Sequence, residues 1–235
     1  MSQWAAGLKH AREPESQSKM NKVVVKKPEH ETIYVQIKEM VLFGEVVPGQ
    51  PLTIHGLAEK LGAGVTPVRE AIRRLTAEGG LATLENRRVV VPTMTMHWLE
   101  QIELVRLTVE PELAEIGAKK CGLDRILELE RLDALIDEAI QKGDIRGYLE
   151  ANYRFHFTIY DAADALILRR ITESLWVRIG PSLRVVCGRF GTANLTDQHR
   201  EATKGLRDGD LEKVKRALQE DIRQGMEFIR QTIEV

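Results

Sequence analysis

Five arginines fall into two groups whose spacing suits contact with a nucleic acid. Arg69 and Arg73 lie four residues apart and Arg74 follows directly, while Arg87 and Arg88 are adjacent. Residues four apart share one face of a helix, so the first group would present two cations on the same side. A guanidinium group donates paired hydrogen bonds to phosphate oxygens and to the edge of a guanine base. The elements around these residues decide whether that chemistry is available.

Two short helical patterns joined by a Gly-rich turn surround the first arginine group. Thr53 is suited to cap the first helix, because its hydroxyl can accept a free backbone N–H. Thr66 is predicted to cap the second helix, with Pro67 at the first helical position, where a missing N–H costs nothing. The apolar residues at helical spacing that should pack the two helices together are Leu57, Ala58, Leu61, Val68, Ile72 and Leu75.

The second arginine group lies at the tip of a predicted β-hairpin. Apolar residues 81–84 and 89–91 flank the tip sequence Glu-Asn-Arg-Arg. Such a winged helix-turn-helix can put its second helix in the major groove and the hairpin tip on or near the backbone. His55, near the start of the first helix, is either a backbone contact or an ordinary surface histidine. The candidate DNA-contacting residues are His55, Thr66, Pro67, Arg69, Arg73, Arg74, Arg87 and Arg88.

The segments LAEKLG, TPVREAIRRL and EG resemble the DNA-binding domain of the GntR family of bacterial transcription regulators. The chain departs from the family at two places. Members usually carry Ser-Arg where this chain has Gly64-Val65, and Arg-Gly at the wing tip where it has Arg87-Arg88. The resemblance implies the winged fold, and the departures imply an altered operator sequence or affinity.

The composition fits a two-domain globular protein. The chain has 235 residues, of which 43% are hydrophobic and 29% charged. Residues 1–92 hold 13 basic and 10 acidic residues, against 21 and 25 in residues 93–235, so the N-terminal part is the better candidate for a polyanion partner. Two widely separated cysteines, Cys121 and Cys187, suggest reduced thiols. Without a membrane-length apolar run or a signal-peptide pattern, we expect a cytoplasmic protein.

Three segments make up the N-terminal part. Residues 1–30 are polar, show no lasting periodicity and are predicted to form a mobile extension. An apolar stripe predicts a further helix from Glu31 to Phe43, so that residues 31–92 form the winged helix-turn-helix domain. Residues 92–96 form a short linker, which implies mechanical communication between the two halves.

The remainder, residues 98–230, shows only helical periodicity. Pro111 predicts a kink or break near Glu110, and Gly180-Pro181 divides another helical segment. The expected helices are Trp98–Ala118, Asp124–Ile140, Asp144–Ala162, Ala165–Ile179, Pro181–Phe190, one capped by Thr196 that runs to Leu206, and Asp210–Ile229. The fold class is therefore mostly α, with a winged helix-turn-helix domain followed by an all-α helical bundle.

This C-terminal half resembles the effector-binding and dimerisation (FCD) domain of the FadR subfamily within the GntR family. The segments that carry the resemblance are RLTVEPELAEIGA, YLEANYRFHFTIYDAA, QHREATKGLRDGD and VKRALQEDI. The resemblance implies a homodimer that binds a small effector in the bundle. It includes no catalytic machinery.

The subfamily resemblance also implies a metal site. Many members hold the metal with an aspartate and three histidines, and the matching positions here are Asn152, His156, His199 and Asp221. Two histidines and a carboxylate suit zinc, nickel or manganese, whereas an asparagine carbonyl is a weaker ligand. The alternative is a metal-free, hydrogen-bonded polar cluster that contacts the effector directly.

An acidic effector is implied by an arginine that commonly faces the pocket in this subfamily. The matching residue is Arg106, whose guanidinium could grip a small carboxylate together with His156, His199 and Arg178. The alternative for Arg106 is a surface pair with Glu110, one helical turn away.

Two functions from different classes remain. The favoured one is a ligand-responsive transcription regulator that binds a palindromic operator as a homodimer and senses a small organic acid. The alternative is a metal-dependent enzyme with an appended nucleic-acid domain, in which the histidines and a carboxylate would activate water. The enzyme reading lacks a separate residue with an obvious general acid or base role. We therefore expect the protein not to be an enzyme.

Overall fold

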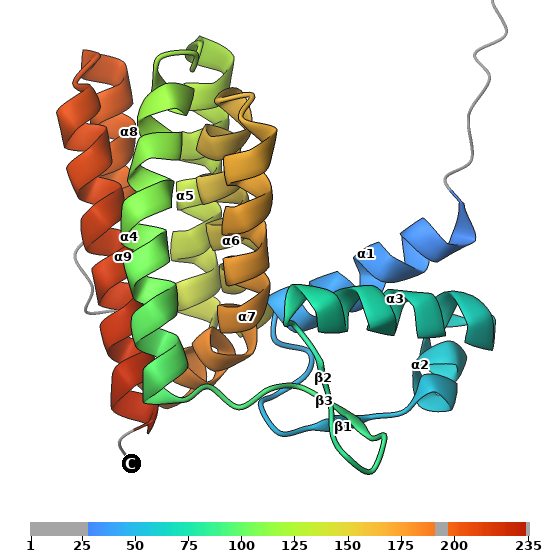
Figure 1. Ribbon diagram of the computed structural model, residues 1–235. Coiled ribbons are helices and arrows are strands. Elements are labelled where there is room, and N and C mark those ends of the chain that lie inside the picture. The colour runs from blue at the N-terminus through green and yellow to red at the C-terminus, as the bar shows by residue number, and fades with distance from the viewer. Residues whose placement is uncertain (1–27, 191–196, 234–235) are drawn as a thin grey trace, which may run out of the picture.

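The computed structural model describes residues 28–190 and 197–233. A small N-terminal domain packs against one end of a bundle of long helices (Figure 1). Most of the predicted extension, residues 1–27, and the predicted cap Thr196 lie outside the described residues. Helix α1 begins at Glu29, two residues before the predicted start of the first helix.

The N-terminal domain is the predicted winged helix-turn-helix. It contains α1 (Glu29–Leu42), α2 (Ile54–Leu61) and α3 (Val65–Glu78). A three-stranded antiparallel sheet follows the order β1-β3-β2 and consists of β1 (Pro51–Leu52), β2 (Ala82–Thr83) and β3 (Val89–Val90). Strands β2 and β3 form the predicted hairpin, and β1 adds a strand that the sequence pattern did not predict.

Local capping fixes where the two central helices begin. The Thr53 side chain accepts the Gly56 N–H at 3.0 Å, which confirms it as the cap of α2. The predicted cap of α3 is wrong, because Gly64 occupies the N-cap position and Thr66 already lies within the helix. Pro67 is therefore the third helical residue, where its missing N–H still has no intrahelical partner to lose.

Beyond Val91, the described residues form helices and the loops that connect them. The helices are α4 (Met96–Ala118), α5 (Leu123–Lys142), α6 (Ile145–Ala162), α7 (Leu166–Phe190), α8 (Gln198–Asp208) and α9 (Leu211–Ile233). The side chains of Asp144, Asp197 and Asp210 accept backbone N–H groups at the starts of α6, α8 and α9. The cap of α8 is thus Asp197, next to the predicted Thr196.

Two prolines do not divide helices as predicted. Helix α4 continues through Pro111, and α7 continues through Pro181. Each proline costs its helix about 3 kcal/mol and one hydrogen bond. Both are buried among other helices, and this packing offsets the cost. The expected division at Gly180-Pro181 is therefore wrong. Of the kink or break expected near Glu110, the break is wrong.

The two domains share one apolar core. Buried residues of α1 and α3 belong to the same cluster as those of α6 and α7. Phe43 meets Tyr153 of α6 edge to face, with ring centroids 5.8 Å apart. At Gly180 of α7, an added Cβ would lie only 2.7 Å from the Leu42 carbonyl oxygen, so the backbones of α1 and α7 are in close contact. This packing supports the expectation of mechanical communication.

None of the helices in the described part of the chain is long and apolar enough to span a bilayer.

Candidate functional site

The exposed face of α3 carries two of the predicted arginines. Arg69 is exposed, and the described residues offer it no hydrogen-bond or ion-pair partner. Arg73, one turn later, is also exposed and donates from Nε at 3.2 Å and from Nη2 at 3.0 Å to a single oxygen, Glu70 Oε2. An exposed pair of this kind contributes little stability and is readily exchanged for a phosphate. Arg69 is therefore the arginine of α3 that is most available for a contact with a DNA phosphate.

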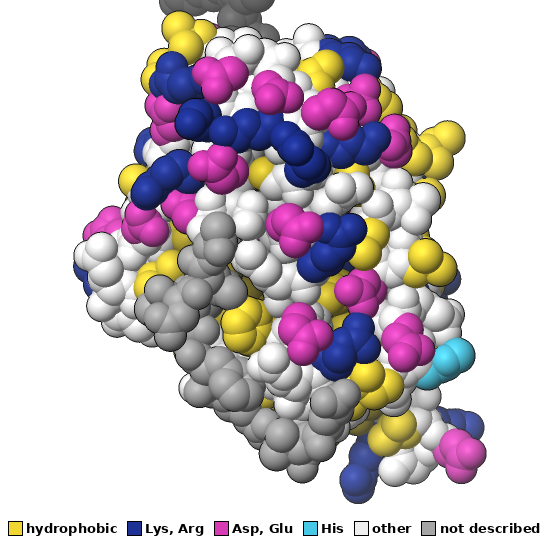
Figure 2. Space-filling view, turned by 90° about the vertical axis from the view of Figure 1, so that its left-hand side faces the viewer, with side chains coloured by type: hydrophobic (Ala, Val, Ile, Leu, Met, Phe, Trp, Pro, Cys, Tyr) yellow, Lys and Arg dark blue, Asp and Glu magenta, His cyan; other side chains and the backbone are white. Residues whose placement is uncertain are grey.

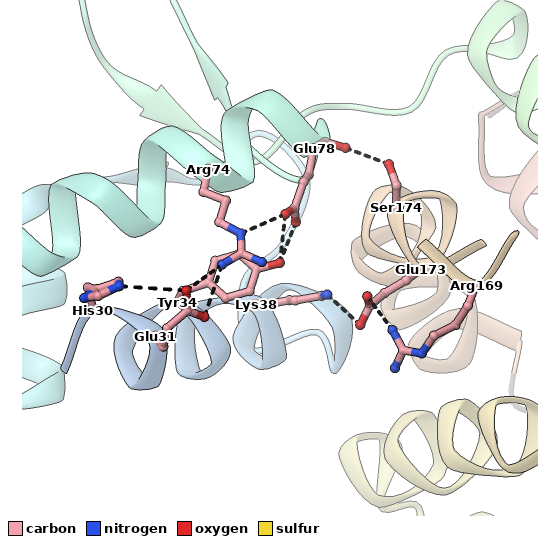
Figure 3. Close-up of polar contacts among 9 residues, drawn as sticks. All are labelled: His30, Glu31, Tyr34, Lys38, Arg74, Glu78, Arg169, Glu173 and Ser174. Carbon is pink, nitrogen blue, oxygen red and sulfur yellow. Dashed lines mark hydrogen bonds and ion pairs between the residues drawn. The ribbon is translucent and has the colours of Figure 1, made fainter. Parts of the chain in front are cut away.

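Arg74 is turned away from this face toward α1. Its guanidinium contacts Glu78 at 3.2 Å and Glu31 at 3.2 Å, and it stacks 3.6 Å above the ring of Tyr34. Its donors are thus used inside the domain (Figure 3). The structure separates Arg74 from Arg69 and Arg73, with which the sequence grouped it.

The other candidate DNA-contacting residues lie on the surface of the same domain. His55, Thr66, Arg87 and Arg88 are exposed and Pro67 is half-buried. Arg87 adopts a left-handed conformation with φ of 63°, which turns the chain at the tip of the wing. The Arg88 N–H is held by Asn86 Oδ1 at 3.1 Å.

Inside the bundle, three side chains from three helices converge. His156 Nε2 of α6 lies 3.0 Å from Asp221 Oδ2 of α9 and 3.4 Å from His199 Nε2 of α8. His199 Nε2 lies 3.6 Å from Asp221 Oδ1. Both histidines are buried, and Asn152 is buried one turn before His156 on the same helix. The structure thus brings three of the four predicted ligand residues together, namely His156, His199 and Asp221.

The hydrogen-bond pattern around His156 decides which of its nitrogens carries a hydrogen. Tyr160 donates its only hydroxyl hydrogen to Glu110 at 2.8 Å, so its oxygen accepts from His156 Nδ1 at 3.2 Å. In a neutral imidazole, Nε2 then presents a lone pair to the Asp221 carboxylate. Two facing acceptors require a proton or a metal ion between them. Fixing the tautomer through the other ring nitrogen is typical of histidine ligands.

The ionisation of these residues also suits a cation. Burial lowers the pKa of His199, and the nearby Asp221 only partly opposes it. Burial alone would raise the pKa of Asp221, but the charge of His156 and its hydrogen bond outweigh burial and leave that pKa at about 2. Metal ligands must be neutral imidazoles or ionised carboxylates. The ionised Asp221 and the neutral imidazole of His199 therefore fit a divalent metal, which would take the place of the proton between His156 Nε2 and Asp221 Oδ2.

A second group of potential ligands shares His199 and was missed by sequence reasoning. Asp133 of α5 and Asp197 place carboxylates near the other ring nitrogen of His199, with Asp133 Oδ1 3.9 Å from Nδ1. Burial, reinforced by the charge of Asp197, raises the pKa of Asp133 to about 6. The sequence signal that could have revealed this group is Asp133, an acidic residue next to the buried Leu132 in the apolar stripe of α5.

Arg106 and Glu110 form a buried pair, so the surface pair considered as an alternative is wrong. Arg106 Nε donates to Glu110 Oε1 at 2.5 Å and Nη2 donates to Oε2 at 3.1 Å, with side chains only 4% and 0% exposed. Glu110 also accepts from Tyr160 and from Trp176 Nε1 at 3.2 Å. Glu110 therefore connects Arg106 to the histidine cluster, a role that sequence reasoning did not assign.

Arg178 lies elsewhere. A Cβ added at Gly79 would meet its guanidinium carbon at 2.2 Å, which places Arg178 against the C-terminal end of α3. A cation at this end of a helix complements the partial negative charge of the free carbonyls. The structure brings His156 and His199 together but leaves Arg178 at the contact between the domains.

Comparisons with known proteins agree with this geometry. Residues 29–91 match the family described as bacterial regulatory proteins, gntR family, and residues 101–224 match the FCD domain. The HTH-type transcriptional regulator McbR of Escherichia coli (strain K12) is 29% identical over 175 residues, which cover 73% of this chain and 79% of McbR. A probable D-xylose utilization operon transcriptional repressor of Paenarthrobacter nicotinovorans is 24% identical over 80% of this chain and 84% of its own length.

Solved structures show the same architecture. E. coli McbR/YncC superposes with a TM-score of 0.80 and 27% identity, covering 86% of this chain and 97% of that chain. A GntR regulator from Rhodococcus sp. RHA1 superposes with a TM-score of 0.70 at 21% identity, over 86% and 97% of the two chains, and shows the fold alone. The relatives are named as transcription regulators, and the chain is accordingly a regulator rather than an enzyme. The chain belongs to the gntR family of bacterial regulatory proteins, with an FCD domain behind its DNA-binding domain.

Proposed function

We propose that this transcriptional regulator is a homodimer that binds a palindromic operator and responds to a small organic acid. Residues 31–92 would bind DNA, and residues 98–230 would bind the effector and form the dimer. The observation that carries the proposal is the outer face of α3, where Arg69 and Arg73 are exposed. One such helix per half-site, in the major groove, accounts for a two-fold operator.

A homodimer is supported by apolar surface on the bundle. Large apolar side chains are exposed on α4 and on the first turns of α7, with Leu104 67% and Ile167 76% exposed. Surface of this kind is common at interfaces between subunits. Sedimentation equilibrium should give twice the mass of the chain, and a monomer at micromolar concentration would refute the dimer.

An acidic effector is supported by the charges of the buried cluster. Arg106 and Glu110 neutralise each other. A divalent metal held by His156, His199 and Asp221 would retain one net positive charge, because only one ligand is anionic. The metal would supply open coordination positions, which favours zinc, nickel or manganese and a carboxylate ligand.

DNA binding can be tested without knowing the operator. Duplexes selected from a random pool by the full-length protein should contain two inverted half-sites. Their affinity should fall steeply with salt, because phosphate contacts release counterions. Selected sequences without inverted repeats would refute the palindromic operator.

Metal binding has a matched control. His156→Ala should abolish tight binding of zinc in titration calorimetry, while His97→Ala should leave it unchanged. His97 is exposed and contacts Gln101 at 2.8 Å, outside the cluster. Equal zinc affinity in the wild type and His156→Ala would remove the metal site. A screen of organic acids by thermal shift would then test the metal-free cluster.

A further inference from the structure

The contact between α7 and the DNA-binding domain includes two polar interactions (Figure 3). Lys38 Nζ of α1 lies 2.6 Å from Glu173 Oε1 of α7. The adjacent Ser174 donates its hydroxyl to the main-chain oxygen of Glu78, the last residue of α3, at 3.1 Å. We call this pair of contacts the α7 clamp. It holds both α1 and the recognition helix α3.

The clamp carboxylate is itself fixed from the bundle side. Arg169 Nη1 donates to Glu173 Oε2 at 2.8 Å, and the Tyr153 hydroxyl donates to Oε1 at 3.2 Å. Lys38 is only 8% exposed. A buried ammonium with a partner that is held by other donors defines one geometry rather than a loose surface attraction.

On the DNA-binding domain, Glu78, which accepts the hydrogen bond from Ser174, is itself held in place by hydrogen bonds. The Glu78 carboxylate accepts from the Tyr34 hydroxyl at 2.8 Å and from Arg74 at 3.2 Å, and Arg74 also reaches Glu31. These contacts lock the end of α3 to α1 (Figure 3). The clamp therefore grips α1 and α3 as one unit.

Glycines let the backbones approach closely around the clamp. A Cβ at Gly80 would meet Val177 Cγ1 at 2.3 Å, and one at Gly180 would meet the Leu42 carbonyl oxygen at 2.7 Å. Contact of this kind leaves little room for sliding. The orientation of α3 relative to the bundle is consequently set by α7.

We propose that Glu173 and Ser174 are positioning residues for operator recognition, and that Arg74 serves the same purpose instead of contacting DNA. They set the direction of α3 relative to the bundle, and hence the separation of the two recognition helices in a dimer. The inference rests on the proposed homodimer and palindrome. Half-sites are read about 34 Å apart, so the heads must be held at that spacing before binding.

The same helix also reaches the buried cluster. Trp176, two residues after Ser174, donates to Glu110, and its ring centroid lies 5.0 Å from that of His156. A change in the packing of Trp176 therefore acts on the helix that carries the clamp. Helix α7 is the physical connection between the effector cluster and α3.

The test compares full-length wild type with Glu173→Gln plus Ser174→Ala. The matched control is Glu138→Gln, whose partner Lys142 lies on the same helix, α5. Each protein is titrated with a half-site, with the selected full operator, and with operators whose half-sites are moved by one or two base pairs. Ser174→Ala alone serves if the double variant fails to fold.

We expect the clamp variant to keep half-site affinity within about twofold and to lose about tenfold or more on the full operator, because the second half-site is no longer presented in register. Its preference for the native spacing should weaken, while the control should match the wild type. Wild-type affinity and spacing preference in the clamp variant would overturn the proposal. So would an equal loss on half-site and full operator.

A second measurement separates positioning from DNA contact for Arg74. Arg69→Ala should reduce the dependence of log affinity on log salt by about one unit, the value for one lost phosphate contact. Arg74→Gln should leave that slope unchanged while broadening the spacing preference. A reduced slope in Arg74→Gln would overturn its assignment as a positioning residue.

One outcome would refute the proposed function and not the clamp. If the wild type does not prefer the full operator to a half-site, the palindromic dimer is wrong. Hydrogen exchange then tests, without DNA, whether the α7 clamp holds α1 and α3. Backbone amides of α1 and α3 should exchange faster in the clamp variant than in Glu138→Gln. Unchanged exchange would overturn the clamp itself.

Discussion

Two Arg–Glu pairs with the same four-residue spacing lie in different surroundings. Arg106 and Glu110 in the bundle are 4% and 0% exposed, whereas Arg74 and Glu78 in the DNA-binding domain are 48% and 27% exposed. The first pair is cut off from water and depends on its own geometry. The second is screened by solvent and depends on its neighbours. Identical spacing therefore predicts that an ion pair forms, but it does not predict how much the pair contributes to the free energy of unfolding.

The contrast extends to the surfaces of the two domains. One face of the bundle shows acidic and basic side chains intermixed (Figure 2). Many cations of the bundle have carboxylate partners, as Lys213 has Glu201 and Arg223 has Glu220. On α3, by contrast, Arg69 is exposed without a partner in the described part of the chain. The exposed, unpaired guanidinium of Arg69 favours DNA contact through α3.

The largest effect should follow from breaking the buried pair. Glu110→Ala would leave Arg106 as an unpaired buried charge and remove the acceptor of Tyr160 and Trp176. We expect a loss of about 3–5 kcal/mol in the free energy of unfolding, measured by urea denaturation.

The double variant Arg106→Met plus Glu110→Leu is the control for that prediction. It removes both charges together but still leaves Tyr160 and Trp176 without their acceptor, so it should recover the part of the lost stability that comes from the unpaired charge of Arg106. A single variant as stable as the wild type would show that the pair is not desolvated in solution.

The clamp pair should have an intermediate effect that depends on pH. Burial would raise the pKa of Glu173, but its contacts with Lys38 and Arg169 lower it below the ordinary value of 4.5. The pair therefore stabilises the fold fully above pH 4.5 and loses its contribution as pH falls through the lowered pKa. Glu173→Gln should cost about 2 kcal/mol at pH 7. The difference in Tm from wild type should shrink in acid, and a difference that grows in acid would contradict the assignment.

The exposed pair should have a smaller effect. Arg74→Ala removes a solvent-screened ion pair and the stacking on Tyr34. We expect a loss of about 1 kcal/mol, measured by the same denaturation assay. A loss as large as that of Glu110→Ala would mean that exposure does not distinguish the two pairs.

The smallest effect on stability should come from Arg69→Ala, at less than about 0.5 kcal/mol, because the side chain is exposed. The same variant should lose specific operator binding while remaining dimeric, as measured by gel shift and sedimentation. Retained operator affinity would contradict the assignment of α3 as the recognition helix.

Sequence patterns predicted the architecture because local rules governed it. The caps Thr53, Asp144 and Asp210 and the apolar stripes all act within a few residues. Where tertiary packing decided, prediction failed: Pro111 and Pro181 are tolerated inside helices that are buried on several sides.

The candidate sites divide in the same way. Convergence of His156, His199 and Asp221 was expected from the subfamily resemblance, and the structure brings them within 3.6 Å of one another. The burial of Arg106 and the turn of Arg74 toward Tyr34 depend on partners distant in sequence. No spacing rule could have supplied them, because the deciding neighbours lie on other helices.

Gly180 has a consequence for engineering this protein. Its α-carbon has only a hydrogen atom where the next larger side chain would press on the Leu42 carbonyl oxygen. Alanine or serine at this position would act as a wedge of graded thickness between α7 and α1. Such substitutions would change the angle between the DNA-binding domain and the helical bundle without altering any charge.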